Sequence, residues 1–226
     1  MSKRKITVAV DSGFNEDYAS FLNKRFDTTF VTFNDVLTKK VKVVLDLLLF
    51  TGGADVNPAM YGEKIGNYTM VNEERDDIEQ KMFSNFSFVP KLGICRGAQA
   101  LTVFSKGSLV QHVNNHTTSH PIHCKTMDEG YYDTYNITST HHQMMFPYNL
   151  KQDKYDIIAW SKYHRSSTYL NGDNEEISLP DNFVEPEIVF YKNTYSLAIQ
   201  GHPEFDNCEG DTVNYCLDLI ENKLFN

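Results

Sequence analysis

The stretch Lys91–Gln99, KLGICRGAQ, decides the fold. An apolar run that contains Leu92 and Ile94 ends in the pentapeptide 93–97, GICRG, and a helix-like segment follows. A nucleophile between two glycines is typical of a tight strand-to-helix turn, where small neighbours let the backbone approach. The helix N-terminus favours a thiolate there, and the next backbone N–H can bind an oxyanion. The motif therefore predicts a reactive Cys95, and a buried structural cysteine is the alternative.

The composition bounds the class of protein. The chain has 226 residues, 41% of them hydrophobic, and this predicts a single domain over residues 1–226. A net charge of −9 argues against nucleic acid or an anionic membrane as a partner. No apolar run reaches the ~18 residues of a membrane span, and the N-terminus lacks a signal peptide, so we expect a soluble, cytoplasmic protein. The cysteines are scattered, which predicts free thiols.

The N-terminal half alternates between two periodicities. The pattern predicts a helix over Glu16–Arg25 and a short helix that Asn34 caps and that runs through Lys40. It predicts strands over Lys5–Asp11, Thr28–Phe33 and Val43–Phe50. The last of these is almost wholly apolar, as in a strand buried on both faces of a parallel sheet. This rhythm predicts an α/β class with a flavodoxin-like doubly wound, mostly parallel sheet and flanking helices. Sites in such sheets lie at the carboxyl ends of strands, where both Gly52-Gly53 and Cys95 fall.

The C-terminal half predicts a small antiparallel addition. We expect helices at Glu73–Phe86 and Gly210–Leu224. We expect strands at Gly107–Val113, Thr134–Thr138 and Tyr155–Ser161, and a hairpin formed by Glu187–Lys192 and Tyr195–Gln200. The polar segment Tyr163–Asn182 is interpreted as a surface excursion or hairpin.

A cysteine nucleophile needs a base. His202 directly follows an apolar strand in 198–204, AIQGHPE, so it also lies at a strand end. Glu204 can accept the other imidazole N–H if Pro203 bends the chain. The sequence thus predicts a Cys95–His202–Glu204 set, and a loop histidine without chemistry is the alternative.

A second group of histidines raises the question of a metal. His112, His116, His120, His123 and Cys124 follow one another at spacings that could place ligands on one face of a helix. Asparagines, threonines and Pro121 between them disfavour a continuous helix. We therefore expect no metal and no cofactor here, and instead a ligand-facing loop or surface histidines.

Five pieces of the chain, in order, resemble the class I glutamine amidotransferase superfamily. They are TGGADVNPAMYGE at 51–63, ERDDIE at 74–79, LGICRGAQ at 92–99, STHHQ at 139–143 and IQGHPE at 199–204. The first piece favours the γ-glutamyl hydrolase branch, peptidase C26, which includes γ-glutamyl-γ-aminobutyrate hydrolase.

The resemblance implies roles for individual residues. Cys95 would be the nucleophile, His202 the base and Glu204 its orienting partner, with backbone N–H groups of Gly53 and Arg96 at the oxyanion. The substrate would be held by Gln99, by the segment Thr140, His141, His142 and Gln143, and by Arg75 at its distal part. For Arg75, pairing with Glu79 on the helix surface is the alternative. Asp55 is expected to build its own loop.

The implied reaction is cysteine-dependent hydrolysis of the γ-glutamyl amide of glutamine or of a γ-glutamyl-amine conjugate through a thioester. The alternative is a glutaminase subunit that delivers ammonia to a separate synthetase partner. The leaving amine and the oligomeric state stay open. The chain departs from the family in Gly201, where an aromatic residue is usual and a wider site floor is expected, and in Lys106, where a second glycine is usual.

Overall fold

The computed structural model describes residues 2–126 and 131–226. A nine-stranded sheet runs through the molecule in the order β2-β1-β3-β4-β13-β12-β10-β7-β8. Its first half is parallel and consists of β1 (Arg4–Val10), β2 (Phe26–Thr32), β3 (Leu47–Phe50), β4 (Lys91–Ile94) and β13 (Ser196–Ile199). The predicted α/β class with a parallel, doubly wound core is thus confirmed.

The second half of the sheet is antiparallel and longer than the predicted hairpin. It continues through β12 (Pro186–Tyr191), β10 (Tyr155–Ser161), β7 (His120–Lys125) and β8 (Tyr132–Ile137). Two small sheets lie beside it, formed by β5 (Ser108–Val110) with β9 (Met144–Phe146) and by β6 (His112–Val113) with β11 (Tyr169–Leu170). The hairpin of β12 and β13 pairs as the sequence predicts.

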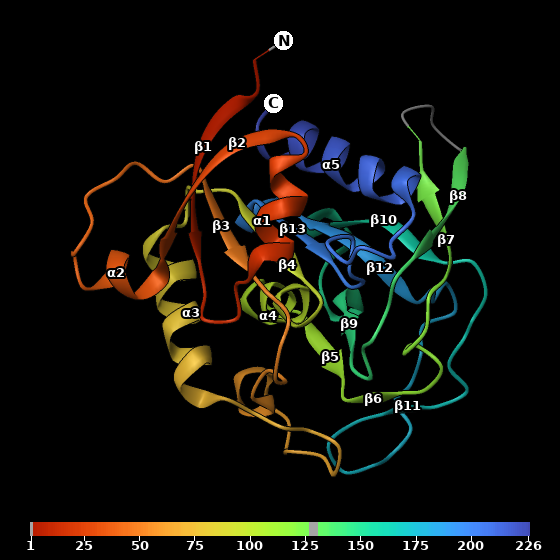
Figure 1. The fold of residues 1–226 in the computed structure, drawn as a ribbon. Coiled ribbons are helices and arrows are strands. Elements are labelled where there is room, and N and C mark those ends of the chain that lie inside the picture. The colour runs from red at the N-terminus through yellow and green to blue at the C-terminus, as the bar shows by residue number, and fades with distance from the viewer. Residues whose placement is uncertain (1, 127–130) are drawn as a thin grey trace.

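Helices cover both faces of the parallel half. α1 (Glu16–Asn23) and α5 (Gly210–Leu224) pack on one face, and α2 (Phe33–Leu37), α3 (Glu73–Asn85) and α4 (Arg96–Phe104) pack on the other (Figure 1). Short 3-10 turns η1 (Pro58–Tyr61), η2 (Pro147–Asn149), η3 (Gln152–Lys154) and η4 (Lys192–Thr194) join the elements. Each sheet face therefore has its own apolar core, and the strand ends are left for the site.

The structure corrects three local expectations. The strand predicted over Val43–Phe50 begins only at Leu47, because pairing with β1 starts there, and Val44 is 83% exposed. The cap of α2 is Thr32, whose hydroxyl accepts the N–H of Asp35, and not Asn34. The segment predicted as Gly107–Val113 divides into β5 and β6, which pair with different partners.

The segment 163–182 contains a hairpin, as the second of the two interpretations predicts, because Leu170 forms an antiparallel bridge with Glu176, but it is not a free surface excursion. Its β11 pairs with β6, and the side chain of Tyr169 is buried with its hydroxyl donating to Glu185 at 2.8 Å. At its far end, the N–H of Gly172 donates to Glu63, and Lys64 pairs with Asp173 at 2.7 Å. The excursion therefore closes over the loop that follows η1.

Close approach at the elbow requires Gly97. A Cβ at this position would lie 2.0 Å from the carbonyl oxygen of Phe50, so α4 could not begin where β3 ends. Lys106 lies past the end of α4 at a φ of 74°, which explains why a glycine would also suit this position.

We predict that Gly97→Ala lowers the free energy of unfolding by about 1–3 kcal/mol, because the backbone of β3 cannot yield to the new methyl group. Urea unfolding at neutral pH measures it. Gly210→Ala at the start of α5 is the matched control: nothing lies within 4 Å of its Cβ, so it should be neutral or stabilising. Equal stability of the two variants would contradict the account.

Candidate active site

Cys95 lies between β4 and α4 in a strained backbone conformation. Its φ is 54° and its ψ is −111°, in a region that non-glycine residues rarely adopt. Its N–H donates to the carbonyl of Ile199 on β13 at 2.8 Å, and its side chain is 9% exposed. The turn thus directs the thiol out of the sheet at the carboxyl ends of the strands, as expected for a nucleophile elbow.

His202 and Glu204 follow β13 and lie against each other. The two side chains are joined between His202 Nδ1, which donates, and Glu204 Oε1 at 2.7 Å. The N–H of His202 donates to the carbonyl of Thr138, and its ring stacks on Phe205 at a centroid distance of 4.2 Å. The imidazole is therefore fixed on one edge by a carboxylate and on one face by an aromatic ring.

The electrostatics keep a proton on His202. Burial lowers its pKa, but hydrogen bonds with Cys95 and Glu204 and the negative charges of both outweigh burial and raise the pKa to about 10. Cys95 and His202 both lie near Gly52, whose Cβ would come within 3.8 Å of Cys95 Cβ and 3.4 Å of His202 Cε1. An imidazolium beside a sulfur nucleophile is thus the resting arrangement that the site favours.

A hydroxyl also reaches the base. Thr140 Oγ1 and His202 Nε2 are 2.8 Å apart. Because His202 is protonated, its Nε2–H donates to this oxygen. Thr140 therefore orients the ring from the side opposite Glu204.

The turn after β3 presents the second predicted oxyanion donor. Gly53 has a φ of 142°, which only glycine adopts without strain. Its preceding carbonyl, that of Gly52, accepts a hydrogen bond of 2.9 Å from Arg75 Nη1, and Thr51 O accepts one of 2.8 Å from Nη2. Arg75 thus holds the turn from behind.

Two buried arginines link the turn to the elbow. Arg75 pairs with Asp11 at 3.0 Å and with Glu79 at 2.7 Å. Arg96 pairs with Glu79 and with Asp76, and its Nε donates to the carbonyl of Ala54 at 3.0 Å. All five side chains are buried. The network therefore fixes the ends of β1, β3 and β4 against α3.

A polar pocket of about 150 Å³ opens beside Cys95. It is lined by Gly53, Asp55, Cys95, Arg96, Gln99, Thr140, His141, His142, Gln143 and His202. The structure thus brings most of the predicted site residues together in one cavity. Glu204 lies behind His202. Arg75 lies outside the lining and pairs with Glu79, but both side chains are buried, so the expected arginine on the helix surface is wrong.

One pocket residue does more than the sequence predicts. Asp55, expected only to build its own loop, accepts the N–H of Met70 at 2.9 Å, but its other oxygen lies 3.4 Å from His142 Nε2. The hydrogen bond to Asp55 raises the pKa of His142. A carboxyl group and an imidazole therefore lie side by side in the pocket wall.

The histidine group 112–124 differs from the sequence expectation. His116 and His120 are buried, so the interpretation as surface histidines is wrong for these two. They lie in the turn before β7 and at its first residue, and not on a helix. The cause is the antiparallel half of the sheet, whose strand β12 supplies Glu187 to both rings. Residues 127–130 of the loop predicted there lie outside the described residues.

Gly201 does not widen the site. A Cβ there would lie 2.5 Å from Cγ1 of Ile137 and 2.8 Å from the carbonyl oxygen of Thr138. The space that an aromatic residue would take is filled by the end of β8.

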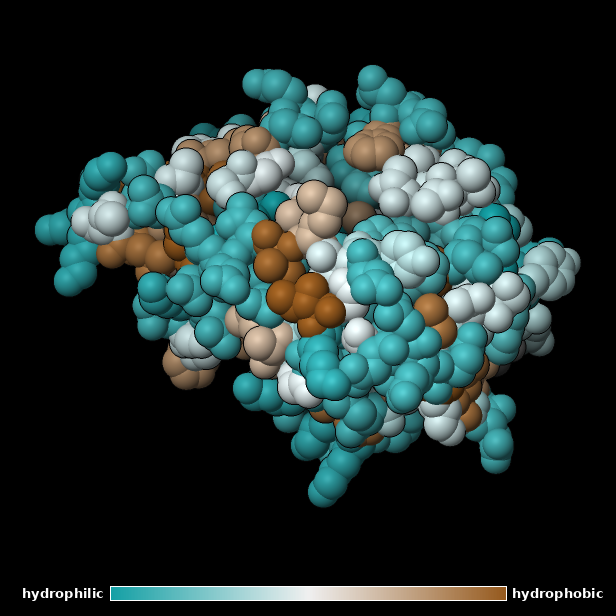
Figure 2. Space-filling view, turned by 90° about the horizontal axis from the view of Figure 1, so that it is seen from below, coloured by the Kyte–Doolittle hydropathy of each residue, from teal (hydrophilic) through white to brown (hydrophobic). Residues whose placement is uncertain are grey.

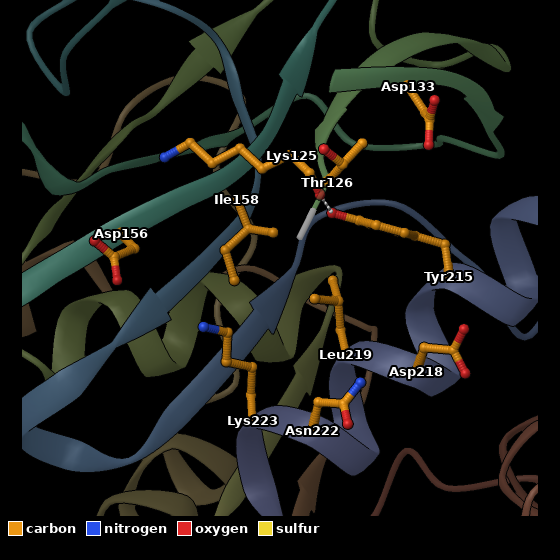
Figure 3. Close-up of a pocket in the computed structure, with 10 residues that line it drawn as sticks. All are labelled: Lys125, Thr126, Asp133, Asp156, Ile158, Tyr215, Asp218, Leu219, Asn222 and Lys223. Carbon is orange, nitrogen blue, oxygen red and sulfur yellow. Dashed lines mark hydrogen bonds between the residues drawn. The ribbon is translucent and has the colours of Figure 1, made fainter. Parts of the chain in front are cut away.

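Figure 2 views the molecule toward the carboxyl ends of the parallel strands and shows a mostly hydrophilic surface with a few hydrophobic residues near its centre. A larger cavity of about 640 Å³ lies elsewhere, between the antiparallel strands and α5 (Figure 3). The described residues that line it include Lys125, Lys223, three aspartates and Tyr215.

The model of the peptidase C26 family matches residues 29–204, which is most of the chain and includes Cys95 and His202. The chain belongs to the peptidase C26 family. Membership in this peptidase family supports an amide hydrolase.

Relatives of this C26 protein carry similar descriptions. It is 26% identical to YvdE, a candidate glutamine amidotransferase-like protein of Lactococcus lactis, over 81% of this chain and 75% of that protein. It is 23% identical to a candidate glutamine amidotransferase-like protein of Rickettsia prowazekii, over 83% of this chain and 80% of the relative.

Solved structures share the fold. A candidate GMP synthase subunit from Thermoplasma acidophilum superposes with a TM-score of 0.63 at 18% identity, covering 97% of this chain and 92% of that chain. A glutamine amidotransferase from Thermotoga maritima gives a TM-score of 0.52 at 14% identity, covering 98% and 86%. Within the described residues, every helix is too short or too polar to cross a membrane.

We predict that Arg96→Met lowers the free energy of unfolding by about 3–5 kcal/mol, because it leaves buried Asp76 without its arginine and buried Glu79 with Arg75 alone. Burial raises the pKa of Glu79 to about 7, so the deficit should shrink as the pH falls below that value and this carboxylate binds a proton. Urea unfolding at pH 7 and pH 5 measures both effects.

Arg25→Met is the matched control for this prediction. Arg25 also pairs with two carboxylates, those of Asp218 at 2.7 Å and Glu221 at 2.6 Å, but its side chain is 31% exposed. Its loss should cost less than about 1 kcal/mol. Equal losses in the two variants would show that burial of the network does not matter.

Proposed function

We propose that this chain hydrolyses the γ-glutamyl amide bond of glutamine or of a γ-glutamyl-amine conjugate through a thioester on Cys95. The observation that carries the proposal is one small polar pocket in which Cys95, at its positive φ, faces a His202 that is bonded to Glu204 at 2.7 Å. Family membership supports amide hydrolysis, and the pocket supports the γ-glutamyl group.

The size and charge of the pocket suit the head of a glutamyl group. About 150 Å³ is smaller than the sites that enclose drug-sized ligands, so a small polar group fits and the amine must point outward. Asp55 and the buried, unpartnered Oε1 of Gln143 can accept from an α-ammonium group. His142, whose pKa is raised beside Asp55, can pair with the α-carboxylate. Gln99 donates to the carbonyl of Gln143 at 3.0 Å and steadies this wall.

In acylation, Cys95 attacks as a thiolate beside the protonated His202. The thiolate sulfur of Cys95 forms a bond to the γ-carbonyl carbon, and the carbonyl electrons move to oxygen. The N–H groups of Gly53 and Arg96 bind that oxyanion, and each such donor lowers the barrier by about 3 kcal/mol. The tetrahedral intermediate collapses, the C–N bond breaks, and His202 Nε2 gives its proton to the leaving amine.

Deacylation reverses these roles. His202, now neutral, takes a proton from water, and the hydroxide attacks the thioester carbon. The C–S bond breaks, glutamate leaves, and Cys95 and His202 return to their resting state. Arg75 acts in this scheme as a positioning residue, because its guanidinium bonds the carbonyls of Thr51 and Gly52 behind the oxyanion turn.

The loop between β3 and α3 and the segment 163–182 govern which amine leaves. They meet at Gln111, whose amide donates to Glu63 at 2.6 Å and to the carbonyl of Lys64 at 2.9 Å. Thr69 in this loop accepts from Gln143 Nε2 at 3.0 Å, which connects the loop to the pocket wall. A glutaminase that depends on a separate synthetase is the second candidate.

We predict that Cys95→Ala loses at least about 10³-fold in glutamate release and keeps its fold. The purified chain is assayed with glutamine and a panel of γ-glutamyl amines, and circular dichroism checks the fold. Cys208→Ala, which removes a half-buried thiol outside the pocket, is the control and should stay active.

Two outcomes would contradict this proposal. Normal activity of Cys95→Ala would exclude the thioester. Absence of activity on the whole panel, with glutaminase activity appearing only when a synthetase is added, would favour the second candidate over the free-standing hydrolase.

The pH dependence tests the role of His202. Because its pKa is raised to about 10, the protonated form that the leaving amine needs is present below that pH and is lost above it. We predict that kcat/KM for an amide substrate falls as the pH rises through about 10. Glu204→Gln removes one of the charges that raise the pKa, so its alkaline limb should lie about 1–3 units lower. An unchanged limb in Glu204→Gln would refute this assignment.

A further inference from the structure

A second buried polar cluster lies behind the pocket wall. It consists of His116 in the turn before β7, His120 at the start of β7, His141 in the loop after β8, Glu187 on β12 and Glu185 just before it. Each of these residues is at most 3% exposed. Only His141 also lines the active-site pocket, so most of this cluster has no part in the proposed reaction.

His141 has the tautomer of a metal ligand. Its Nδ1–H donates to the carbonyl of Gln143 at 2.8 Å, which leaves the lone pair on Nε2. Burial lowers the pKa of His141 to about 3, so the ring is neutral. Nε2 is buried and has no hydrogen-bond partner in residues 2–126 and 131–226. Metal-ligating histidines characteristically hold one ring nitrogen against a backbone carbonyl and offer the other to the ion.

His116 and Glu187 add further unpartnered atoms. Both ring nitrogens of His116 and the Oε2 atom of Glu187 are buried and have no hydrogen-bond partner among the described residues. His116 Nδ1 lies 3.5 Å from Glu187 Oε1, and Nε2 lies 3.4 Å from Glu185 Oε1. Each unsatisfied buried group costs about 1–3 kcal/mol, so a cluster of them needs a compensating occupant.

We propose that His116, His141 and Glu187 bind a divalent transition-metal ion, Zn²⁺ in the first place. One ligand atom from each lies within 4.8 Å of the other two. Zinc takes nitrogen and carboxylate ligands at about 2.0–2.2 Å, so a small inward movement of the three side chains closes the site. Two imidazoles and one carboxylate form a donor set that zinc uses.

The surroundings complete an outer shell of the kind that metal sites have. The carbonyl oxygen of Gln143 accepts a hydrogen bond from His141, and the carboxylate of Glu185 lies beside Nε2 of His116. His120 Nε2 lies 2.8 Å from Glu187 Oε1, which leaves Oε2 for the ion. Glu185 in turn accepts the N–H groups of Arg165 and Ser166, both at 2.8 Å. Each ligand is thus oriented by a partner of its own.

The competing occupant is a proton. Burial lowers the pKa of His116, but the nearby carboxylates of Glu185 and Glu187 raise it to about 9. A protonated His116 would then neutralise the glutamates without a metal. The two possibilities are distinguished by whether the purified protein binds a metal ion.

The ion would act on the active site through the polypeptide segment 140–143. His141 is the neighbour of Thr140, which bonds His202 Nε2, and of His142 and Gln143 in the pocket wall. A metal on His141 would therefore fix this segment, while Cys95 remains the group that reacts. The site is one of positioning and not of catalysis.

The test uses the full-length Cys95→Ala variant without an affinity tag, because this removes the thiolate–imidazole pair as a rival zinc site. The protein is stripped with a chelator and titrated with Zn²⁺, and bound metal is counted by mass spectrometry. We expect one ion per chain and a rise in melting temperature of about 5–10 °C at saturation. Absence of both would overturn the proposal and favour the proton.

Matched variants locate the ion. His116→Gln and Glu187→Gln should each weaken zinc binding at least about 10-fold, and Glu187→Gln retains an oxygen that His120 can bond. His123→Gln changes a partly exposed histidine on the same strand, and it should bind like the parent. Circular dichroism confirms that each variant is folded. Unchanged affinity in both ligand variants, or loss in His123→Gln alone, would refute the assignment.

Discussion

The backbone conformation of Cys95 is the constraint on which the rest of the site depends. A non-glycine residue at a φ of 54° and a ψ of −111° costs about 1–3 kcal/mol, and the surrounding structure must compensate for it. Compensation comes from α4, which is buried along its whole length, and from its first residue, Arg96, whose guanidinium is paired with Asp76 and Glu79. The elbow therefore cannot relax without exposing a helix and breaking a buried ion network.

The same network couples the two halves of the proposed oxyanion site. Glu79 accepts from both Arg75 and Arg96, so one carboxylate joins the turn at Gly53 to the elbow at Cys95. Buried ion pairs contribute little net stability, because desolvation offsets the attraction, but they are sensitive to the loss of one partner. What this arrangement provides is fixed geometry, which a preorganised oxyanion site needs.

The sequence predicted the parts of the structure that local pattern controls. Apolar strands that end at Gly53, Cys95 and His202 pointed to one edge of a parallel sheet, and the closing helix 210–224 was predicted to the residue. Contacts between distant segments were not predictable: nothing near His116 or Arg96 in the chain shows that Glu187 or Asp76 will meet them in the interior. The polar residues around His116 suggested a surface turn, because the strand that buries it lies far along the chain.

The central claim is that the sulfur of Cys95 forms a covalent bond with the γ-carbonyl carbon of a glutamine-like substrate. Its most direct test is treatment of the native protein with the electrophile 6-diazo-5-oxo-norleucine, followed by intact-mass analysis and peptide mapping. We expect a single adduct on Cys95, formed together with complete loss of activity and slowed by glutamate. An adduct on another residue, or full inactivation without modification of Cys95, would contradict the claim.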